Sequence, residues 1–320
     1  MIDGRRRMVS LVATTRRPLL PMTWKDGLIY LGYLALFFCS ISLLLWQHRQ
    51  FRKSRLPFEE NLKLLRGPGE TQLRLVRQFD EDGFMWMILA AIIPATLVLG
   101  LLLITAQLPR ELQLSGAALS LGIFALAFRQ ASRWFTRKAQ ESSNRYLGYF
   151  GERLVAEHLE PMKSQGWRIF HDVPASMRGE NFDVDHVAVG PAGIFVLETK
   201  TRRKGHARPG FDDHKVYFDG QALVWPWGED NHGLEQAERS ARWLSDLVRD
   251  EIGERVFVAP VLVLPGWVVE MKPSLMTRLC QVTNPQGLDQ MLPVAPTVVD
   301  LRLVDVISAK LEARCRDVEY

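Results

Sequence analysis

Hydrophobic residues are concentrated in the first part of this chain, where they form long runs. Residues 27–47 and residues 84–106 contain no charged side chain, and each run is about long enough to cross a lipid bilayer. A third run, residues 112–128, is shorter and includes serine and glutamine. This pattern predicts a membrane region at residues 27–128 with two or three α-helical transmembrane segments, preceded by a basic N-terminal segment at residues 1–26.

Neither buried core helices nor a signal peptide fits these runs as well. Buried core helices rarely supply two uncharged stretches of this length in one short region. A cleaved signal peptide would start earlier, be shorter and end at a small-residue cleavage site. Basic residues flank the runs, and the positive-inside rule places the C-terminal domain in the cytoplasm with either two or three spans. We therefore expect an integral protein of a bacterial-type inner membrane, with the lipid bilayer as a partner, and favour three spans because they also keep the basic loop inside.

The loop between the first two runs has leucine and valine at near-helical spacing on both sides of Gly67-Pro68-Gly69. This spacing predicts two short amphipathic helices within residues 61–83. The Gly-Pro-Gly-Glu-Thr stretch lacks the Gly-Lys-Ser/Thr ending of a phosphate-binding loop, so no nucleotide cofactor is expected.

The second half of the chain alternates between helical and extended patterns. Apolar residues recur every three or four positions in residues 144–162, which predicts a helix, and a second long helix is predicted at 231–252. Strands are predicted at residues 167–173, 182–190, 193–200 and 255–266, with a hairpin at 215–225 through Asp219-Gly220. The tail predicts a helix near 274–279, an extended stretch at 296–299 and a last helix at 301–315.

This order of elements is typical of an α/β domain in which a mixed sheet is flanked by helices. We place the domain at residues 145–270, after a polar and basic linker at residues 129–144. A C-terminal extension at residues 271–320 is expected to pack on it. The 320-residue chain carries a formal net charge of +4 and three cysteines without close spacing, so neither a disulfide framework nor a zinc site is indicated.

Charged residues stand on two neighbouring predicted strands. Asp185 precedes the Gly-Pro-Ala-Gly turn at residues 190–193, and Glu198 and Lys200 end the strand after it. If the strands pair by the shortest closure, residue 189 meets residue 194, and Asp185 lies opposite Glu198. Two carboxylates beside an ammonium group suit a metal-dependent phosphodiesterase, because the carboxylates hold a hard cation and the lysine acts on the attacking water. The alternative is an ordinary salt bridge at strand ends.

In a strand, residues two apart share a face. Asp183 therefore points to the same side as Asp185, either as a spare acid of the site or as a solvated side chain, while Val184 and His186 point to the other side. We expect His186 to make a structural hydrogen bond. Three loop histidines lack metal-ligand spacing: His206, His214 and His232.

Three segments of this half resemble one family, in order. They are GYFGERLVAEHL at residues 148–159, FDVDHVAVGPAGIFVLETK at residues 182–200, and the helix glutamine of NHGLEQAERSARWL at residues 231–244. The combination resembles the nuclease-related domain, NERD, of the PD-(D/E)xK nuclease superfamily. The resemblance covers about residues 145–265 and leaves the membrane region and the C-terminal tail unexplained.

The resemblance implies a restriction-endonuclease-like fold and a set of site residues. Asp185 and Glu198 would ligate Mg²⁺ or Mn²⁺ together with the main-chain carbonyl of Thr199. Lys200 would activate or orient the attacking water. Glu152 would complete the acidic site through a second ion or a water.

On the later helix, Gln236 would support the lysine or the phosphate. The resemblance thus implies a membrane-anchored, metal-dependent nuclease that hydrolyses DNA phosphodiester bonds on the cytoplasmic side. Two alternatives stay open. One is a nucleic-acid-binding or signalling module that cuts little or not at all, and the other is a membrane-tethered interaction protein whose acidic cluster is structural.

Four basic residues follow the lysine closely in sequence: Arg202, Arg203, Lys204 and Arg208. They would line the mouth of the site and hold the phosphates of DNA, or they form a solvated face of a loop. Trp225 and Trp227, on either side of Pro226, would stack nucleic-acid bases or pack within the hairpin.

Overall fold

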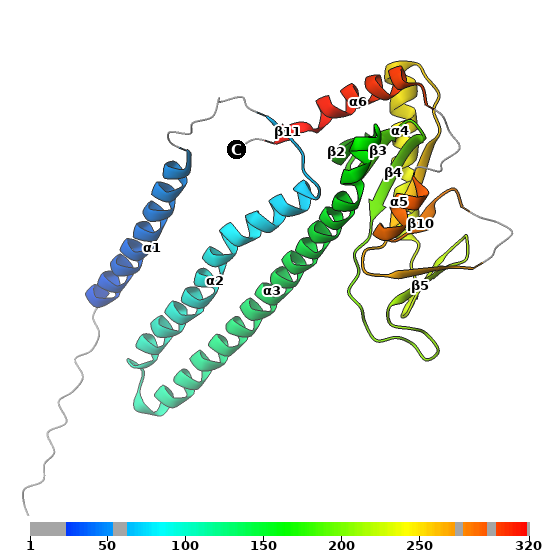
Figure 1. Ribbon diagram of the computed structural model, residues 1–320. Helices are drawn as coiled ribbons and strands as arrows, with labels where there is room; N and C mark the ends of the chain where they lie inside the picture. The colour runs from blue at the N-terminus through cyan, green and yellow to red at the C-terminus, as the bar shows by residue number, and fades with distance from the viewer. Residues whose placement is uncertain (1–23, 54–62, 273–277, 293–298, 319–320) are drawn as a thin grey trace, which may run out of the picture. The chain divides into compact units, whose positions relative to one another are not determined.

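The computed structural model describes residues 24–53, 63–272, 278–292 and 299–318 (Figure 1). The chain divides into two compact units. The first comprises residues up to 58 together with 92–127, and the second comprises residues 59–91 together with 128–320. Two long helices, α2 (Glu70–Thr105) and α3 (Arg110–Leu159), each contribute residues to both units.

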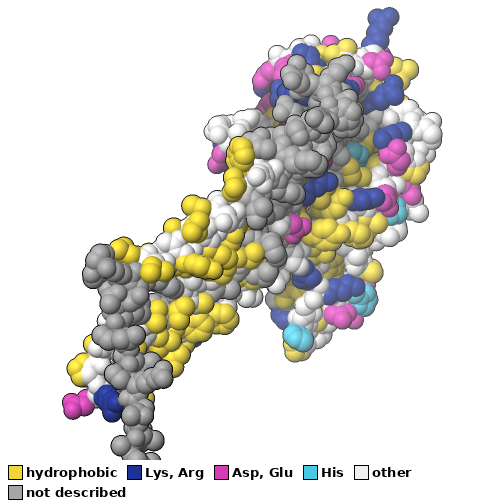
Figure 2. All heavy atoms as spheres, turned by 90° about the vertical axis from the view of Figure 1, so that its left-hand side faces the viewer, with side chains coloured by type: hydrophobic (Ala, Val, Ile, Leu, Met, Phe, Trp, Pro, Cys, Tyr) yellow, Lys and Arg dark blue, Asp and Glu magenta, His cyan; other side chains and the backbone are white. Residues whose placement is uncertain are grey.

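All three apolar runs are helical, in α1 (Trp24–Lys53), α2 and the first part of α3. By length and composition, two of the described helices could cross a membrane. They are α2, through Ile88–Thr105 with a mean hydropathy of 2.6, and α3, with a mean hydropathy of 1.5 over its most apolar window. Only 6% of each window is buried, and large hydrophobic side chains of both windows are exposed. Figure 2 shows hydrophobic side chains on the surface of the helical part of the chain. The described part of α1 has a shorter apolar stretch, Leu31–Leu43.

The second unit is built on a five-stranded mixed sheet in the order β10-β8-β4-β3-β2. Its antiparallel strands are β2 (Arg168–Met177), β3 (Glu180–Gly190) and β4 (Gly193–Thr199). Its parallel strands are β8 (Val258–Val263) and β10 (Gln281–Thr283), which continue the sheet from β4. The predicted mixed α/β fold is therefore confirmed.

A four-stranded sheet and two small elements complete the unit. The sheet has the order β7-β6-β5-β9, with β5 (Lys215–Phe218), β6 (Leu223–Trp225), β7 (Gly228–Glu229) and β9 (Val268–Met271). Its β5–β6 pair is the predicted antiparallel hairpin. A two-stranded sheet joins β1 (Leu64–Leu65) to β11 (Arg316–Val318) near the end of the chain.

Helices cover both faces of the five-stranded sheet. One face packs Val187 and Val196 against α4 (His232–Ile252) and α6 (Leu301–Cys315). The other face packs Leu197 against the end of α3, the 3₁₀ helix η1 (Glu160–Gln165) and α5 (Leu288–Met291), which follows the 3₁₀ helix η2 (Pro285–Gly287). β4 is buried at every position because helices cover both of its faces. Strands buried on both faces have near-continuous apolar sequences.

The hairpin between β3 and β4 has the predicted register. Val189 pairs with Ile194, and the ladder continues outwards to His186 and Leu197. The turn is tight because Gly190 lies against the ring of Trp167, where a side chain would overlap the indole. This register leaves Asp185 and Glu198 as the next pair outwards, at the end of the hairpin away from the turn.

One sequence-based expectation needs correction. The loop at residues 61–83 was expected to form two helices, but Leu64 and Leu65 pair with β11, and only the second helix is found among the described residues, as the start of α2. Residues 59–91 group with the globular unit. The predicted linker at residues 129–144 is helical and forms the middle of α3, so the third apolar run and the first domain helix are one continuous helix.

The alternation of faces also fails in β3. Val184 packs in the same core as Val187 and Val189, although strict alternation places it on the other side. The interruption coincides with Asp172 on the paired strand, whose φ of 49° is in the left-handed region. Asp183 and Asp185 consequently have different partners. The helix expected near 274–279 and the extended stretch at 296–299 lie largely outside the described residues, whereas the last helix is confirmed as α6.

Replacing Gly190 with alanine tests the hairpin geometry. The new methyl group would overlap the buried Trp167 ring, so we expect a loss of about 1–3 kcal/mol in the free energy of unfolding, as for other overpacked sites. Gly228→Ala is the matched control, because a Cβ at position 228 would meet no heavy atom within 4 Å, and it should change stability by less than about 0.5 kcal/mol. Urea unfolding followed by tryptophan fluorescence measures both, and equal midpoints would contradict the close approach.

Candidate functional site

The end of the β3–β4 hairpin brings Asp185 to the main chain of β4. Asp185 Oδ2 accepts a hydrogen bond from Thr199 N at 2.6 Å. Glu198 Oε1 lies 2.9 Å from Lys200 Nζ. Lys200 N donates to Val263 O of β8 at 3.0 Å, which fixes the end of β4. The three residues that the sequence placed at one centre are therefore together.

Two helices approach this strand end closely. Gly151 of α3 lies against Thr201, and a side chain at position 151 would overlap the threonine hydroxyl. Gly233 of α4 lies against Lys200, where a Cβ would come within 3.0 Å of the lysine Cγ. These contacts bring Glu152, which is 6% exposed, into the buried surroundings of the same carboxylates.

Carboxyl groups are concentrated at this site. Burial raises the pKa of Glu152 to about 8, and the charges of Asp172 and Glu198 add to the effect. Burial also raises the pKa of Asp185 well above its usual value, with further contributions from Glu198 and Glu152. Glu152 Oε2 is buried without a hydrogen-bond partner in the described structure. The site therefore holds more acid than its own contacts neutralise.

Lys200 is the cation nearest to these acids. Burial acts to lower its pKa, but the charges of Glu198 and Asp185 outweigh burial and raise it. Lys200 therefore stays protonated at neutral pH. One ammonium group faces three carboxyl groups, so a further cation would stabilise the arrangement.

The donors at this centre suit a small divalent cation. Asp185, Glu198 and the carbonyl of Thr199 offer only hard oxygen atoms, which magnesium and manganese prefer, and magnesium is commonly held by one or two carboxylates with water completing its shell. Among the described residues, no group of three or more His, Cys, Asp and Glu side chains forms a ready-made metal cage. The set thus fits an ion that keeps water ligands.

Gln236 lies one turn further along α4 than Gly233. Its Oε1 is buried and has no hydrogen-bond partner in the described part of the chain. It lines an open groove of about 790 Å³ beside the β2–β3 hairpin, together with Phe182 and Arg239. The guanidinium of Arg239 lies 4.4 Å from the centre of the Phe182 ring. The structure thus assigns Gln236 to a groove lined by half-buried cationic and aromatic groups.

The four basic residues after Lys200 all have contacts within the chain. Arg202 pairs with Asp230, and Arg203 donates to Ser143 Oγ at 2.8 Å. Lys204 lies 6.0 Å from the centre of the Trp267 ring. Arg208 donates to two main-chain carbonyls, those of Pro226 and Trp225, and stacks on Phe211. Arg208 thus anchors its loop, whereas the exposed Arg203 and Lys204 are more available to a ligand.

The remaining candidates are structural. His186 makes the expected hydrogen bond, and its partner is His171, with the two Nδ1 atoms 2.9 Å apart. Burial lowers the pKa of both rings, so the pair is neutral near pH 7. Trp225 is buried and stacks on Trp227 with ring centres 5.5 Å apart, which favours packing over base stacking for Trp225.

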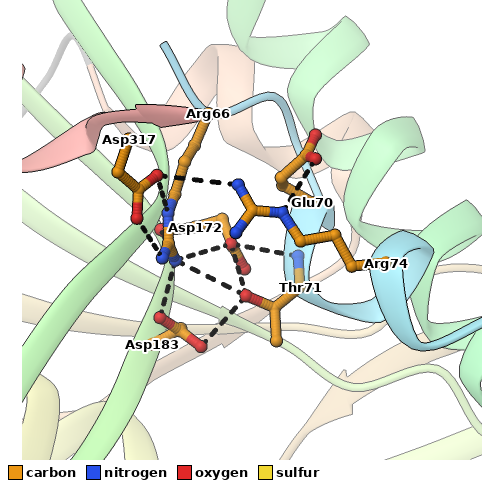
Figure 3. Close-up of polar contacts among 7 residues, drawn as sticks. All are labelled: Arg66, Glu70, Thr71, Arg74, Asp172, Asp183 and Asp317. Carbon is orange, nitrogen blue, oxygen red and sulfur yellow. Dashed lines mark hydrogen bonds and ion pairs between the residues drawn. The ribbon is translucent and has the colours of Figure 1, made fainter. Parts of the chain in front are cut away.

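Sequence reasoning missed a second polar cluster next to the site (Figure 3). Asp183, expected to be a spare acid or solvated, pairs with Arg66 at 2.8 Å and accepts from Thr71 Oγ1 at 3.1 Å. Asp172 contacts the same two residues. These partners are more than 100 positions apart in sequence, and the only local signal was the Gly-Pro-Gly stretch that precedes α2.

Comparison with known proteins gives one match. Residues 147–265 match the family described as nuclease-related domain, NERD. No curated protein and no solved structure matches the chain. A nuclease-related domain is thus found from the last turns of α3 to just beyond β8, and the mixed α/β fold is consistent with the PD-(D/E)xK superfamily.

Glu152→Gln tests the buried carboxyl group through stability. A folded-state pKa of about 8, above the ordinary 4.5, means that the folded protein retains a proton that the unfolded chain loses. Stability should therefore fall as pH rises between about 4.5 and 8. The variant should lose less stability over this range, because its glutamine cannot ionise. Unfolding midpoints measured from pH 5 to pH 9 with a chelator give the difference between wild type and variant.

The matched control is Glu157→Gln, on the same helix, where the carboxylate is exposed and pairs with Arg153. The difference between its unfolding midpoint and that of wild type should be nearly constant with pH. Parallel curves for wild type and Glu152→Gln would contradict a raised pKa.

Proposed function

We propose that this protein is a metal-dependent nuclease that hydrolyses phosphodiester bonds of DNA. The observation that carries the proposal is the convergence of Asp185, Glu198 and Lys200 at one strand end, with the buried Glu152 beside them, inside a nuclease-related domain. An acidic centre with one fixed ammonium group matches the needs of phosphodiester cleavage, where negative charge develops on the phosphate oxygens.

The roles of the residues follow from their chemistry. Asp185, Glu198 and the carbonyl of Thr199 would hold Mg²⁺ or Mn²⁺, which when bound polarises the phosphate and lowers the pKa of water. Lys200, held against Glu198 and protonated, would donate hydrogen bonds to the developing negative charge. Glu152, with a pKa near 8, is suited to exchange a proton close to neutral pH.

Two surfaces could guide a nucleic-acid strand to this centre. The groove beside Gln236 offers the guanidinium of Arg239 and the ring of Phe182. On the segment after Lys200, the exposed Arg203 and Lys204 offer positive charge for backbone phosphates. Gln236 would then support the phosphate and not the lysine.

We also propose that the domain is anchored to the cytoplasmic face of a bacterial-type inner membrane. The apolar windows of α2 and α3 are exposed, whereas a helix from the core of a soluble protein would be mostly buried. Four exposed basic residues follow the apolar part of α3: Arg129, Arg133, Arg137 and Lys138. Their positive charge favours the cytoplasmic side for the domain that follows.

The nuclease proposal is tested with the purified chain and plasmid or single-stranded DNA in the presence of Mg²⁺ or Mn²⁺. Lys200→Ala and Asp185→Asn should each lower the cleavage rate by about 100-fold or more, because each removes a fixed charge at the reacting phosphate. Lys163→Ala is the control, since Lys163 is exposed and pairs with Glu160. Metal-independent binding without any cleavage would favour the nucleic-acid-binding module instead.

Lys204→Ala and Arg208→Ala should separate DNA binding from stability. Lys204 is exposed, so its loss should weaken DNA binding and reduce the salt dependence of the dissociation constant by about one counterion, with stability unchanged. Arg208 donates to two main-chain carbonyls, so its loss should lower the unfolding midpoint. Fluorescence anisotropy across a salt series and thermal unfolding measure the two effects, and an identical pattern for both variants would contradict this assignment.

A further inference from the structure

The segment Leu64–Arg74, here named the N-terminal strap, lies well before the matched domain in sequence but packs on it. Its first two residues form β1, which pairs antiparallel with β11 at the other end of the chain. Arg66 N also donates to Cys315 O at 2.9 Å. The strap and the last strand are therefore held together at one edge of the globular unit.

Arg66 is the centre of this packing (Figure 3). Its guanidinium lies 3.0 Å from Asp172, 2.8 Å from Asp183 and 2.7 Å from Asp317. Only 10% of the Arg66 side chain is exposed, and only 4% of that of Asp172. A planar guanidinium can contact several carboxylates at once, so one cation joins the strap, the central sheet and the C-terminal strand.

The start of α2 adds further donors to the same acids. Thr71 N and Thr71 Oγ1 donate to Asp172 Oδ2 at 3.1 and 2.7 Å, and the hydroxyl is 3.1 Å from Asp183 Oδ2. Thr71 is the second residue of α2, where a main-chain amide has no partner within the helix. The carboxylate of Asp172 thus occupies a favourable position at a helix N-terminus.

The strap also lies directly on the proposed site. A Cβ at Gly69 would come within 2.9 Å of the Tyr149 ring and 3.4 Å of Glu152 Oε2, so only a glycine allows this approach. Asp172 and Asp183 lie close enough for their charges to act on Glu152. Asp183 stands two residues before Asp185 on β3. The partners of Arg66 are therefore part of the wall of the acidic centre.

We propose that the N-terminal strap is a working part of the nuclease site and that Arg66 is its positioning residue. This inference rests on the proposed function. By neutralising Asp172 and Asp183, Arg66 keeps these acids from repelling Glu152, and it holds the Gly69 backbone against the Glu152 carboxyl group. The domain defined by residues 147–265 alone lacks this cation.

The experiment uses the full chain and three variants. In Arg66→Ala, the buried carboxylate of Asp172 and the partly buried carboxylate of Asp183 lose their cation, a change that is costly in protein interiors. We expect kcat for DNA cleavage with saturating Mn²⁺ to fall on the order of tenfold or more, with KM little changed, because the site is misplaced and the DNA-contacting groups are intact. Amide hydrogen exchange in residues 147–153 should also become faster, on the order of tenfold, as the cover over Glu152 loosens.

A second substitution separates charge compensation from simple tethering. Arg66→Ala/Asp183→Asn removes one of the acids that Arg66 neutralises, while Thr71 can still bond Asp172. We expect this double variant to recover most of the lost kcat and the slow exchange. Arg74→Ala is the control on the same strap. Arg74 is 42% exposed, and its contact with Asp317 is long, at 3.7 Å. This variant should stay within about twofold of wild type in both measurements.

Three outcomes would overturn the inference. They are a folded Arg66→Ala with wild-type kcat and exchange, a double variant no better than Arg66→Ala, or equal losses in Arg74→Ala. If Arg66→Ala does not fold, Arg66→Lys carries the test. Lysine keeps the positive charge but cannot contact the three carboxylates at once, so kcat should be lower than in wild type but measurable, and hydrogen exchange should be moderately faster. A wild-type protein that cuts no DNA would defeat the proposed function, and the exchange measurements would still decide the role of Arg66.

Discussion

The register of the β3–β4 hairpin is the constraint on which the site depends. A shift of one residue would turn every side chain of β4 to the opposite face. It would separate Asp185 from the Thr199 amide and turn Glu198 and Lys200 into the core beneath α3. The register is held by the tight turn against Trp167, by burial of both strand faces, and by parallel pairing of β4 with β8. The acidic centre is therefore a consequence of how the hydrophobic sheet packs.

That packing brings three carboxyl groups together in a buried site with one lysine to compensate them. Glu152 and Asp185 are brought close to Glu198, and burial raises the pKa of Glu152 and Asp185. Lys200 compensates Glu198 at close range. Buried charges without partners are costly, so a stable protein keeps such a group only where another interaction requires it. Excess buried acid with an unpartnered carboxylate oxygen is therefore one of the observations that support the proposed cation site.

Local sequence patterns were enough to predict the centre itself. Asp185, Glu198 and Lys200 lie on one hairpin, and the shortest closure of its turn determines their pairing, so the prediction needed no distant contact. The same holds for the β5–β6 hairpin and for the helices α4 and α6. The family resemblance added Glu152 and Gln236, which lie on separate helices that no local pattern connects to the hairpin.

Contacts between distant segments could not be predicted. Arg66 lies 106 positions from Asp172 and 251 from Asp317, and its own neighbours suggested a helix where the structure has a strand. The alternation of side chains between the two faces of β3 holds at Val187 and Val189 but fails at Val184. The interruption coincides with the positive φ of Asp172 on the paired strand. His171 was not recognised as the partner of His186 because the predicted strand ended at residue 173, whereas β2 continues to Met177 and forms a hairpin with β3.

The two long helices, α2 and α3, both reach the buried Glu152. α3 contains an apolar run in its first part and carries Glu152 in its last turns, while α2 begins beside Glu152 at Gly69 and continues into the apolar stretch Ile88–Thr105. Both helices that could enter a membrane therefore lead directly to the same buried carboxyl group. Arg66 and Thr71 bind the start of α2 to the sheet that holds Asp183 and Asp185.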